Sequence, residues 1–207
     1  MFYRNRLPPI IGFSALVVFF AVFSRSAYAG EIKEAAATSS GTATTSEQSV
    51  WYRTAWQHAE DTWRHGGWEL YVPVYTFHLP FAYTPTLLRS YNDYPAGAGI
   101  GRGHYNASGN WEGIYAMEFA DSHGHPEYHA GYGWIPTWRP FTENSRIGVG
   151  LTGFIMARSD IRRYTPFPGV LPLGSIGYRI VDIQAAYVPG GKNDGNVMLF
   201  WAKWSFY

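Results

Sequence analysis

The last segment of the chain, residues 196–206, limits the available folds more than any other. Its side chains alternate between two sets, and one set is wholly apolar: Met198, Phe200, Ala202, Trp204 and Phe206. Because successive side chains of a β-strand point to opposite faces, this set occupies one face of the strand. In water such a face would be an exposed apolar patch. The pattern therefore predicts a closing strand whose outer face contacts lipid, as in the wall of a membrane β-barrel.

The composition agrees with a barrel and excludes several other classes of protein. The 207 residues are 18% aromatic and only 15% charged, against about 25% charged residues in ordinary soluble domains. Beyond the N-terminus, no apolar run reaches the roughly 20 residues that a spanning helix needs. A formal net charge of +1 gives no electrostatic reason to expect nucleic acid as a partner. The lack of cysteine excludes disulfides, thiolate catalysis and zinc–thiolate sites.

Residues 1–29 have the pattern of a secretory signal peptide. A basic start precedes an apolar core at residues 10–23, and a small-residue cleavage site, Ala-Tyr-Ala, ends at residue 29. The alternative is a retained anchor helix, for which the apolar core is short. Residues 30–48 are rich in Ala, Ser and Thr without periodicity, which predicts a disordered lead-in.

Residues 49–66 are predicted to form an amphipathic helix. Apolar side chains recur every four residues on one face, Ser49 is in position to cap the start, and Gly66 ends the pattern. Tryptophan on the apolar face, at Trp51 and Trp63, suits a helix that lies at a bilayer surface. A helix packed against a water-soluble core fits the same segment equally well.

The chain from Trp68 to Tyr207 alternates short aromatic and β-branched runs with Gly, Pro, Asn and Asp. The prediction is an all-β fold, an eight-stranded antiparallel transmembrane β-barrel, preceded by the short amphipathic helix. Hairpin turns are expected at 106–110 and 192–196, where Gly109 and Gly195 supply positive φ. The predicted strands are residues 69–79, 97–106, 110–120, 128–138, 146–157, 172–178, 181–189 and 196–206.

Strand direction indicates where an active site would lie. If both chain termini lie on one side of the membrane, the first and third strands end at the same rim of the barrel. This places His78 near Asp121 and Ser122. A histidine near a hydroxyl can act as general base, and a carboxylate can fix its tautomer. The serine would then be a nucleophile or an oxyanion donor. The alternative is that His78 is an interfacial polar residue and that Asp121 and Ser122 are ordinary turn formers.

Three histidines follow the Asp-Ser pair, namely His123, His125 and His129. Histidine clusters can bind metal ions, but no carboxylate–histidine pattern with the spacing of known metal ligands accompanies them. No metal site is therefore predicted, and no cofactor is implied.

Prolines and one glycine indicate how lipid would reach the lumen. Proline cannot donate a hydrogen bond to a sheet ladder, so proline in a closed wall leaves neighbouring strands partly unpaired. Gly133 lies in the strand that returns inward from the Asp-Ser turn, where a side chain would shorten a pocket for an acyl chain; simple barrel packing also explains it. The prolines in question, which would leave two lateral gaps, are Pro73, Pro95, Pro172 and Pro189.

Several stretches together resemble one known family, the PagP-type lipid A palmitoyltransferases. The resemblance covers nearly everything from Trp51 to Phe206 and rests on the helix and on YVPVYTFHLPFAY, SYNDYPAGAG, GNWEGIYAMEFADS, AGYGWIPTWRP, LPLGSIGY and AYVPGGKNDGNV. It implies a barrel in the bacterial outer membrane with its helix on the periplasmic side. It also implies transfer of a palmitoyl chain from a glycerophospholipid donor to lipid A of lipopolysaccharide, or to its precursors.

The resemblance also implies roles for individual residues. His78 matches the family's catalytic histidine, and Asp121 with Ser122 matches its catalytic pair. Gly133 matches the glycine at the floor of the family's acyl-chain ruler, which implies selectivity for palmitoyl. The prolines that flank its two lateral gates match Pro73 with Pro95, and Pro172 with Pro189. The His-Gly-His-Pro turn after Ser122 departs from the family's more aromatic and basic loop, which leaves the acylated position of lipid A open.

Two other classes of protein share the strand pattern. A non-catalytic outer-membrane barrel with a structural or adhesive role would have a lumen filled by polar side chains, and few inward charges are expected between Trp68 and Tyr207. A lipocalin-like soluble binder is also an eight-stranded barrel, but the apolar outer face of residues 198–206 argues against it. Membrane lipids are therefore the expected surroundings, and the sequence leaves both a monomer and a homodimer open.

Overall fold

The computed structural model describes residues 46–207, with the backbone alone for residues 46–53 and 162. The predicted signal peptide, 1–29, and most of the lead-in lie outside the described residues. The strands form one antiparallel sheet in the order β4-β3-β2-β1-β9-β8-β7-β6-β5. Their bounds are β1 Gly67–His78, β2 Gly97–Tyr105, β3 Trp111–Ala120, β4 Pro126–Ile135, β5 Thr137–Trp138, β6 Ser145–Arg158, β7 Phe167–Tyr178, β8 Val181–Val188 and β9 Val197–Phe206.

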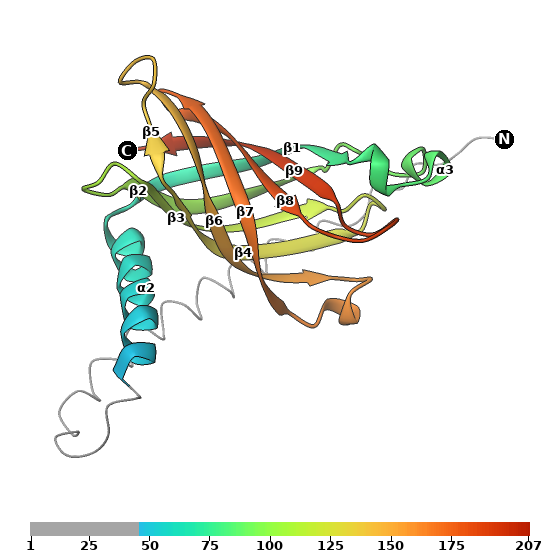
Figure 1. Ribbon diagram of the computed structural model, residues 1–207, viewed down its shortest axis with the longest axis horizontal. Helices are drawn as coiled ribbons and strands as arrows, with labels where there is room; N and C mark the ends of the chain where they lie inside the picture. Colours follow the sequence, from blue (N-terminus) through green and yellow to red (C-terminus); the bar gives the residue numbers. More distant parts are fainter. Residues whose placement is uncertain (1–45) are drawn as a thin grey trace. The chain divides into compact units, whose positions relative to one another are not determined.

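The sheet closes on itself through pairing between β4 and β6 (Figure 1). The short strand β5 continues β4 beyond Pro136 and pairs with the same neighbour, β6, so the two occupy one position in the wall. Proline interrupts the ladder there because it lacks an N–H donor. The predicted antiparallel barrel of eight wall strands is confirmed.

The closing strand β9 has the two faces that its sequence predicts. Leu199, Trp201, Lys203 and Ser205 are buried in the lumen. The alternate positions point outward, where Phe206 is 56% exposed. Other strands expose large apolar side chains on the same outer surface, among them Leu70, Val149, Leu151, Val170 and Ile176. Large apolar side chains on the outer surface are typical of a wall in contact with hydrocarbon.

Helix α2 (Ser46–His65) precedes the barrel and contacts β2 and β3. It begins before Ser49, so the predicted N-cap at Ser49 is wrong and the last residues of the predicted lead-in are helical. It ends where Gly66 N–H donates to the Thr62 carbonyl at 2.9 Å. The guanidinium of Arg102 donates to the Gly66 carbonyl from Nε and Nη2, at 2.9 and 2.6 Å. None of the helices in the described range is long and apolar enough to cross a membrane.

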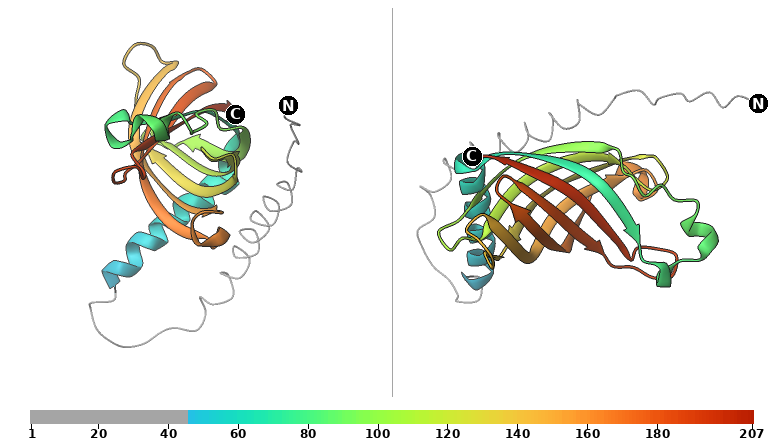
Figure 2. Two further views of the ribbon diagram at one scale, coloured as in Figure 1. Left: turned by 90° about the vertical axis from the view of Figure 1, so that its right-hand side faces the viewer. Right: turned by 90° about the horizontal axis from the view of Figure 1, so that it is seen from above.

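Helix α2 lies at one end of the barrel (Figures 1 and 2). At the same end, the first residues of β1 pair with the last residues of β9. The opposite end carries the β1–β2 connection, which contains the 3-10 helix η1 (Pro80–Ala82) and the short helix α3 (Pro85–Leu88). The hairpin glycines behave as predicted, with φ of 77° at Gly109 and 64° at Gly195.

Buried charges fill the lumen at the α2 end. Lys203 Nζ lies 2.7 Å from Glu69 Oε1 and 3.4 Å from Asp182 Oδ2, and none of the three side chains is more than 2% exposed. Arg146 Nε lies 3.2 Å from Asp182 Oδ1 on the other side. The expectation of few inward charges is therefore wrong for this end. Glu69 and Lys203 are 134 residues apart in the sequence, and the pairing of β1 with β9 brings them together.

The hydrogen-bond ladder is interrupted at two places in the wall. The β1–β2 pairing covers only Gly67–Tyr71 on β1, so the remaining residues of that strand, 72–78, have no β2 partner. The β7–β8 pairing begins only at Leu173 on β7, although β7 itself starts at Phe167. The predicted strand 172–178 was therefore too short at its start. Strand β7 accommodates Pro168 and Pro172 because the residues before Leu173 have no partner on β8.

Candidate active site

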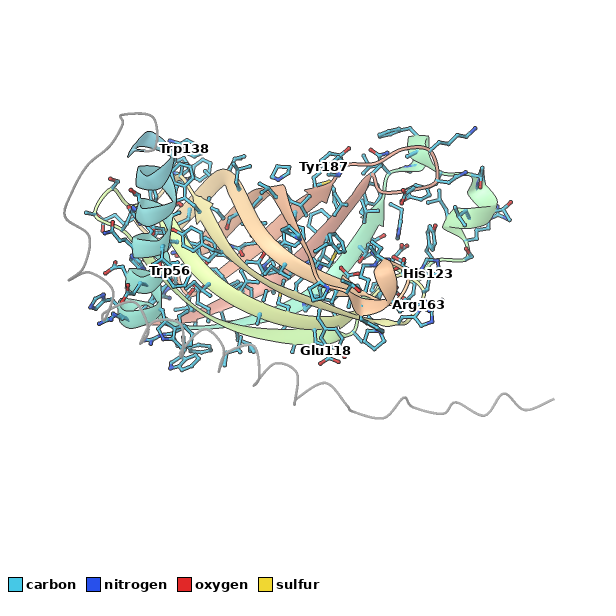
Figure 3. All side chains as sticks on the ribbon, turned by 90° about the horizontal axis from the view of Figure 1, so that it is seen from below. Trp56, Glu118, His123, Trp138, Arg163 and Tyr187 are labelled. Carbon is cyan, nitrogen blue, oxygen red and sulfur yellow. The ribbon has the colours of Figure 1, made fainter. Side chains whose placement is uncertain are left out.

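The structure brings His78 and Ser122 together at the end of the barrel away from α2. His78 is the last residue of β1, and Ser122 lies in the turn that follows β3. The Ser122 hydroxyl oxygen lies 3.0 Å from His78 Nε2. His78 is only 7% exposed, so the pair is largely withdrawn from solvent. Figure 3 shows the neighbouring His123 at this end, far from Trp56 of α2.

Asp121 lies at the same end of the barrel as His78 and Ser122, as predicted, but its carboxylate is bonded to its own turn. Its Oδ1 accepts hydrogen bonds from the backbone N–H groups of His123, at 2.9 Å, and His125, at 2.8 Å. Its Oδ2 lies 3.6 Å from Arg158. Within the described residues it makes no hydrogen bond or ion pair with His78. Asp121 thus shapes the turn that presents Ser122, as aspartate commonly does through bonds to its own following backbone.

A carboxylate that belongs to none of the predicted site residues contacts His78 directly. Asp93 Oδ1 lies 3.1 Å from His78 Nδ1, and the Asp93 side chain is 39% exposed. Asp93 belongs to the stretch SYNDYP between α3 and β2. The only sequence signal was a carboxylate in the loop next to the strand that ends in His78.

Aromatic rings enclose the imidazole of His78. Tyr91 stacks on it, with ring centroids 4.5 Å apart and an interplanar angle of 21°. Tyr83 meets it edge-on at 5.4 Å. Burial raises the pKa of both tyrosines above its ordinary value, and the charge of Asp194 adds to this effect. Both phenols therefore remain neutral at physiological pH and act as rigid apolar walls with a polar edge.

A second polar cluster lies next to Asp121, on β4, at the end of β6 and in the residues that follow β6. Arg158 Nη1 lies 3.2 Å from Glu127, and its Nε and Nη2 donate to Asp160 at 3.0 and 2.8 Å. Burial disfavours the ionised Asp160 carboxyl, but Arg158 outweighs burial and lowers the pKa of Asp160. His129 Nε2 lies 2.5 Å from Glu127 Oε1, and its ring stacks on Phe154.

The three histidines of the HGHPEYH run thus have separate surroundings. His129 lies in the lumen beside Glu127, His123 packs edge-on against Tyr91, and the His125 side chain is 61% exposed. No group of three or more His, Cys, Asp or Glu side chains suited to a metal ion occurs in the described part of the chain.

A cavity of about 500 Å³ opens beside the His78–Ser122 pair. This volume lies within the roughly 300–1,000 Å³ that is usual for small-molecule sites. The walls are mainly apolar: Met117, Phe119, Phe154, Leu171 and Leu199 are among the lining residues. Deeper in the lumen the lining includes Tyr115 and Thr152, whose hydroxyl groups are hydrogen-bonded at 2.7 Å, and Trp201. The apolar part of this cavity suits an aliphatic chain, and its polar lining includes Asp121, Glu127 and Arg158.

Gly133 is buried on β4 but does not line this cavity. A Cβ at this position would come within 2.8 Å of the Trp111 indole and 3.3 Å of the Leu173 side chain. The Trp111 indole is fixed on its other side, since its Nε1 donates to Glu69 at 3.0 Å. The space at Gly133 therefore belongs to Trp111, which lies between the cavity residues and the buried charges.

The four prolines border the two interruptions of the ladder. Pro73 lies within β1, just past its last β2-paired residue, and Pro95 precedes β2. Pro172 lies within β7, next to the first β8-paired residue, rather than at the strand's start as predicted. Pro189 directly follows β8.

Comparison with known proteins identifies a family for this arrangement. Residues 58–203 match the family model described as "Antimicrobial peptide resistance and lipid A acylation protein PagP". A relative from Laribacter hongkongensis is 46% identical over 154 residues, which cover 74% of this chain and 73% of the relative. A relative from Methylobacillus flagellatus is 41% identical over 158 residues, 75% of this chain and 84% of the relative. One from Bordetella pertussis is 42% identical over 156 residues, 75% of this chain and 85% of the relative. All three are named "Lipid A acyltransferase PagP".

Proposed function

The chain belongs to the PagP family, and from this premise we propose that it transfers a palmitoyl chain from a glycerophospholipid to lipid A in the bacterial outer membrane. The acceptor is lipid A of lipopolysaccharide or one of its precursors. The observation that carries the proposal is the His78–Ser122 pair beside a cavity with mainly apolar walls. The apolar outer surface of the barrel supports a location in the membrane that holds both substrates.

His78 acts as the general base of the transfer. Its Nε2 takes the proton of an attacking hydroxyl while that oxygen forms a bond to the ester carbonyl of the donor. The ester bond to the glycerol oxygen then breaks, and the proton moves to that oxygen, which releases a lysophospholipid. Two routes use this chemistry. The lipid A hydroxyl attacks directly while Ser122 stabilises the oxyanion, or Ser122 first carries the acyl group and lipid A then removes it.

Asp121 contributes through the turn that it organises. Its bonds to the His123 and His125 backbone fix the chain on either side of Gly124, and this holds Ser122 within reach of His78. Arg158, 3.6 Å away, balances the buried carboxylate. Loss of Asp121 is therefore expected to impair transfer by displacing Ser122.

The two interruptions of the ladder are lateral gates for lipid. Strands without mutual hydrogen bonds can separate at lower cost than paired strands, because no bond has to be broken in hydrocarbon. Pro73 and Pro95 keep the β1–β2 gate unpaired, and Pro172 and Pro189 do the same between β7 and β8. A donor acyl chain can then pass from the bilayer into the cavity without leaving the membrane.

Gly133 sets the depth of the acyl pocket through Trp111. The missing side chain leaves room for the indole, which packs in the same buried cluster as the cavity residues Tyr115 and Trp201. The buried charges behind Trp111 prevent the pocket from extending toward α2. This fixed floor accounts for selection of one chain length.

Expression in a Gram-negative bacterium that lacks lipid A palmitoyltransferase activity tests the proposal. The protein should fractionate with the outer membrane, and lipid A should gain the mass of one palmitoyl group. His78→Ala should abolish the gain while the barrel still folds, because the wall does not depend on this residue. His125→Ala is the matched control, since that side chain is exposed in the same region. An unchanged lipid A with folded wild-type protein, or full activity of His78→Ala, would refute the proposal.

A further inference from the structure

Both ring nitrogens of His78 have partners, and the two partners differ in kind. Nε2 lies 3.0 Å from the hydroxyl of Ser122, and Nδ1 lies 3.1 Å from the carboxylate of Asp93. An ionised carboxylate only accepts hydrogen bonds, whereas a hydroxyl can donate or accept. Nδ1 must therefore carry the proton in this pair, and Nε2 of the neutral ring is left as an acceptor.

We infer that Asp93 is the positioning residue of the active site: it keeps the His78 proton on Nδ1 and so leaves Nε2 as the base that faces Ser122. This inference rests on the proposed acyl transfer and adds to it the carboxylate that orients the base. The arrangement of hydroxyl, imidazole and carboxylate is the one by which a hydrolase triad selects its histidine tautomer. The Asp93 carboxylate bonds to the imidazole, so Asp93 acts through His78.

Asp121 does not have the geometry for this task. Its Oδ1 already accepts two backbone hydrogen bonds in the turn, and its Oδ2 faces Arg158. Of the two carboxylates near Ser122, Asp93 alone makes a hydrogen bond to His78 in the described residues.

The backbone fixes Asp93 relative to the other two residues. Thr76 N–H, on the strand that ends in His78, donates to the Asp93 carbonyl at 2.8 Å. Asn92 N–H donates to the Ser122 carbonyl at 2.9 Å. These two bonds tie the loop to both β1 and the turn after β3 without using any side chain of the site. The carboxylate position is thus set by the fold, as a positioning residue requires.

The negative charge of Asp93 also favours the imidazolium that forms when Nε2 takes a proton. Replacing the aspartate of a buried triad by asparagine costs ~10⁴-fold in kcat. Asp93 is 39% exposed, so water screens part of its charge. We therefore expect Asp93→Asn to lower kcat by about 10–100-fold, at or below the lower limit of the roughly 100–10,000-fold contribution of general acid–base catalysis. The acyl pocket is untouched, so KM for the donor should change little.

The test uses full-length protein reconstituted with a palmitoyl phospholipid and lipid A. Asp93→Asn should lower kcat and move the acidic limb of the pH profile to lower pH, because loss of the carboxylate favours the neutral ring. Asp93→Glu should restore much of kcat, since it keeps the charge. Glu118→Gln, which neutralises a partly exposed carboxylate on β3 that does not line the cavity, is the matched control and should retain wild-type kinetics.

A second measurement does not depend on activity. Nitrogen-15 NMR of labelled histidine should show the His78 proton on Nδ1 in the wild type and a shift toward Nε2 in Asp93→Asn, whose amide can donate to Nδ1. Unchanged kcat and an unchanged tautomer in Asp93→Asn would overturn the inference. So would a loss that appears only in KM, or one that leaves the pH profile unmoved and is not restored by glutamate. If the wild type transfers no acyl chain, the proposed function fails and the NMR result still decides the role of Asp93.

Discussion

Substitution of Gly133 by alanine tests the proposal that this residue sets the length of the acyl chain transferred. The added Cβ would lie 2.8 Å from the Trp111 indole, whereas ordinary contacts begin at 3.4 Å, so the ring must move by at least 0.6 Å (3.4 − 2.8). The indole is bonded to Glu69 and lies over Lys203, with 4.6 Å between the ammonium and the ring centroid. Because the buried charges block movement toward α2, the displacement is transmitted to the cavity floor.

A raised floor disfavours the longest chain that the pocket accepts. One surplus methylene in an apolar pocket is worth about 1–3 kcal/mol, or roughly 10–200-fold in specificity. Gly133→Ala should therefore reduce transfer of palmitoyl by a factor in this range relative to a shorter saturated chain. Gly133→Met, with a longer side chain, should shift the preference further.

The assay is a competition among phospholipid donors that differ only in the length of their saturated chains, with the products read from the mass of lipid A. Gly153→Ala is the matched control, because a Cβ at that position meets no atom within 4 Å. Its preference should equal that of the wild type. A folded Gly133→Ala protein that still selects palmitoyl with wild-type specificity would show that Trp111 and Gly133 do not set the chain length.

Two further predictions concern the stability of the α2 end. Lys203→Met should lower the free energy of unfolding by about 3–5 kcal/mol, since it leaves Glu69 and Asp182 without their shared buried cation. Denaturant unfolding in detergent measures this loss, and the double variant with Glu69→Gln should lose less than the sum of the two single losses. A loss below about 1 kcal/mol in Lys203→Met would contradict the prediction. Arg102→Ala should loosen α2 by about 1–3 kcal/mol, because both hydrogen bonds to the Gly66 carbonyl are lost. Limited proteolysis of α2 should then become faster while acyl transfer persists, and equal cleavage rates would count against this role of Arg102.

Local patterns were sufficient to predict the wall of the barrel. Alternation in residues 198–206 identified the closing strand, and Gly109 and Gly195 identified two hairpins that have the expected positive φ. The predicted strand began at residue 172, whereas β7 begins at Phe167 and its first residues run along an interruption in the ladder. A sequence pattern does not tell which side of a strand lacks a neighbour.

The candidate site was predictable only in part. Strand direction correctly placed His78 near Ser122, because both follow from where β1 and β3 end. The partner of His78 Nδ1 depends on how the loop between α3 and β2 folds back, and that path leaves no periodic signal. Asp121 was expected to face the imidazole, yet its carboxylate is used by the backbone of its own turn.

The central claim is that the cavity beside His78 and Ser122 passes one acyl chain from phospholipid to lipid A. The most direct measurement uses purified protein in vesicles, with a donor whose palmitoyl group is isotopically labelled and lipid A as the acceptor. The account predicts that lipid A gains one labelled palmitoyl group while an equal amount of lysophospholipid is released, and that His78→Ala does neither. Folded wild-type protein that leaves the label on the donor, or transfers it equally well without the imidazole of His78, would contradict the account.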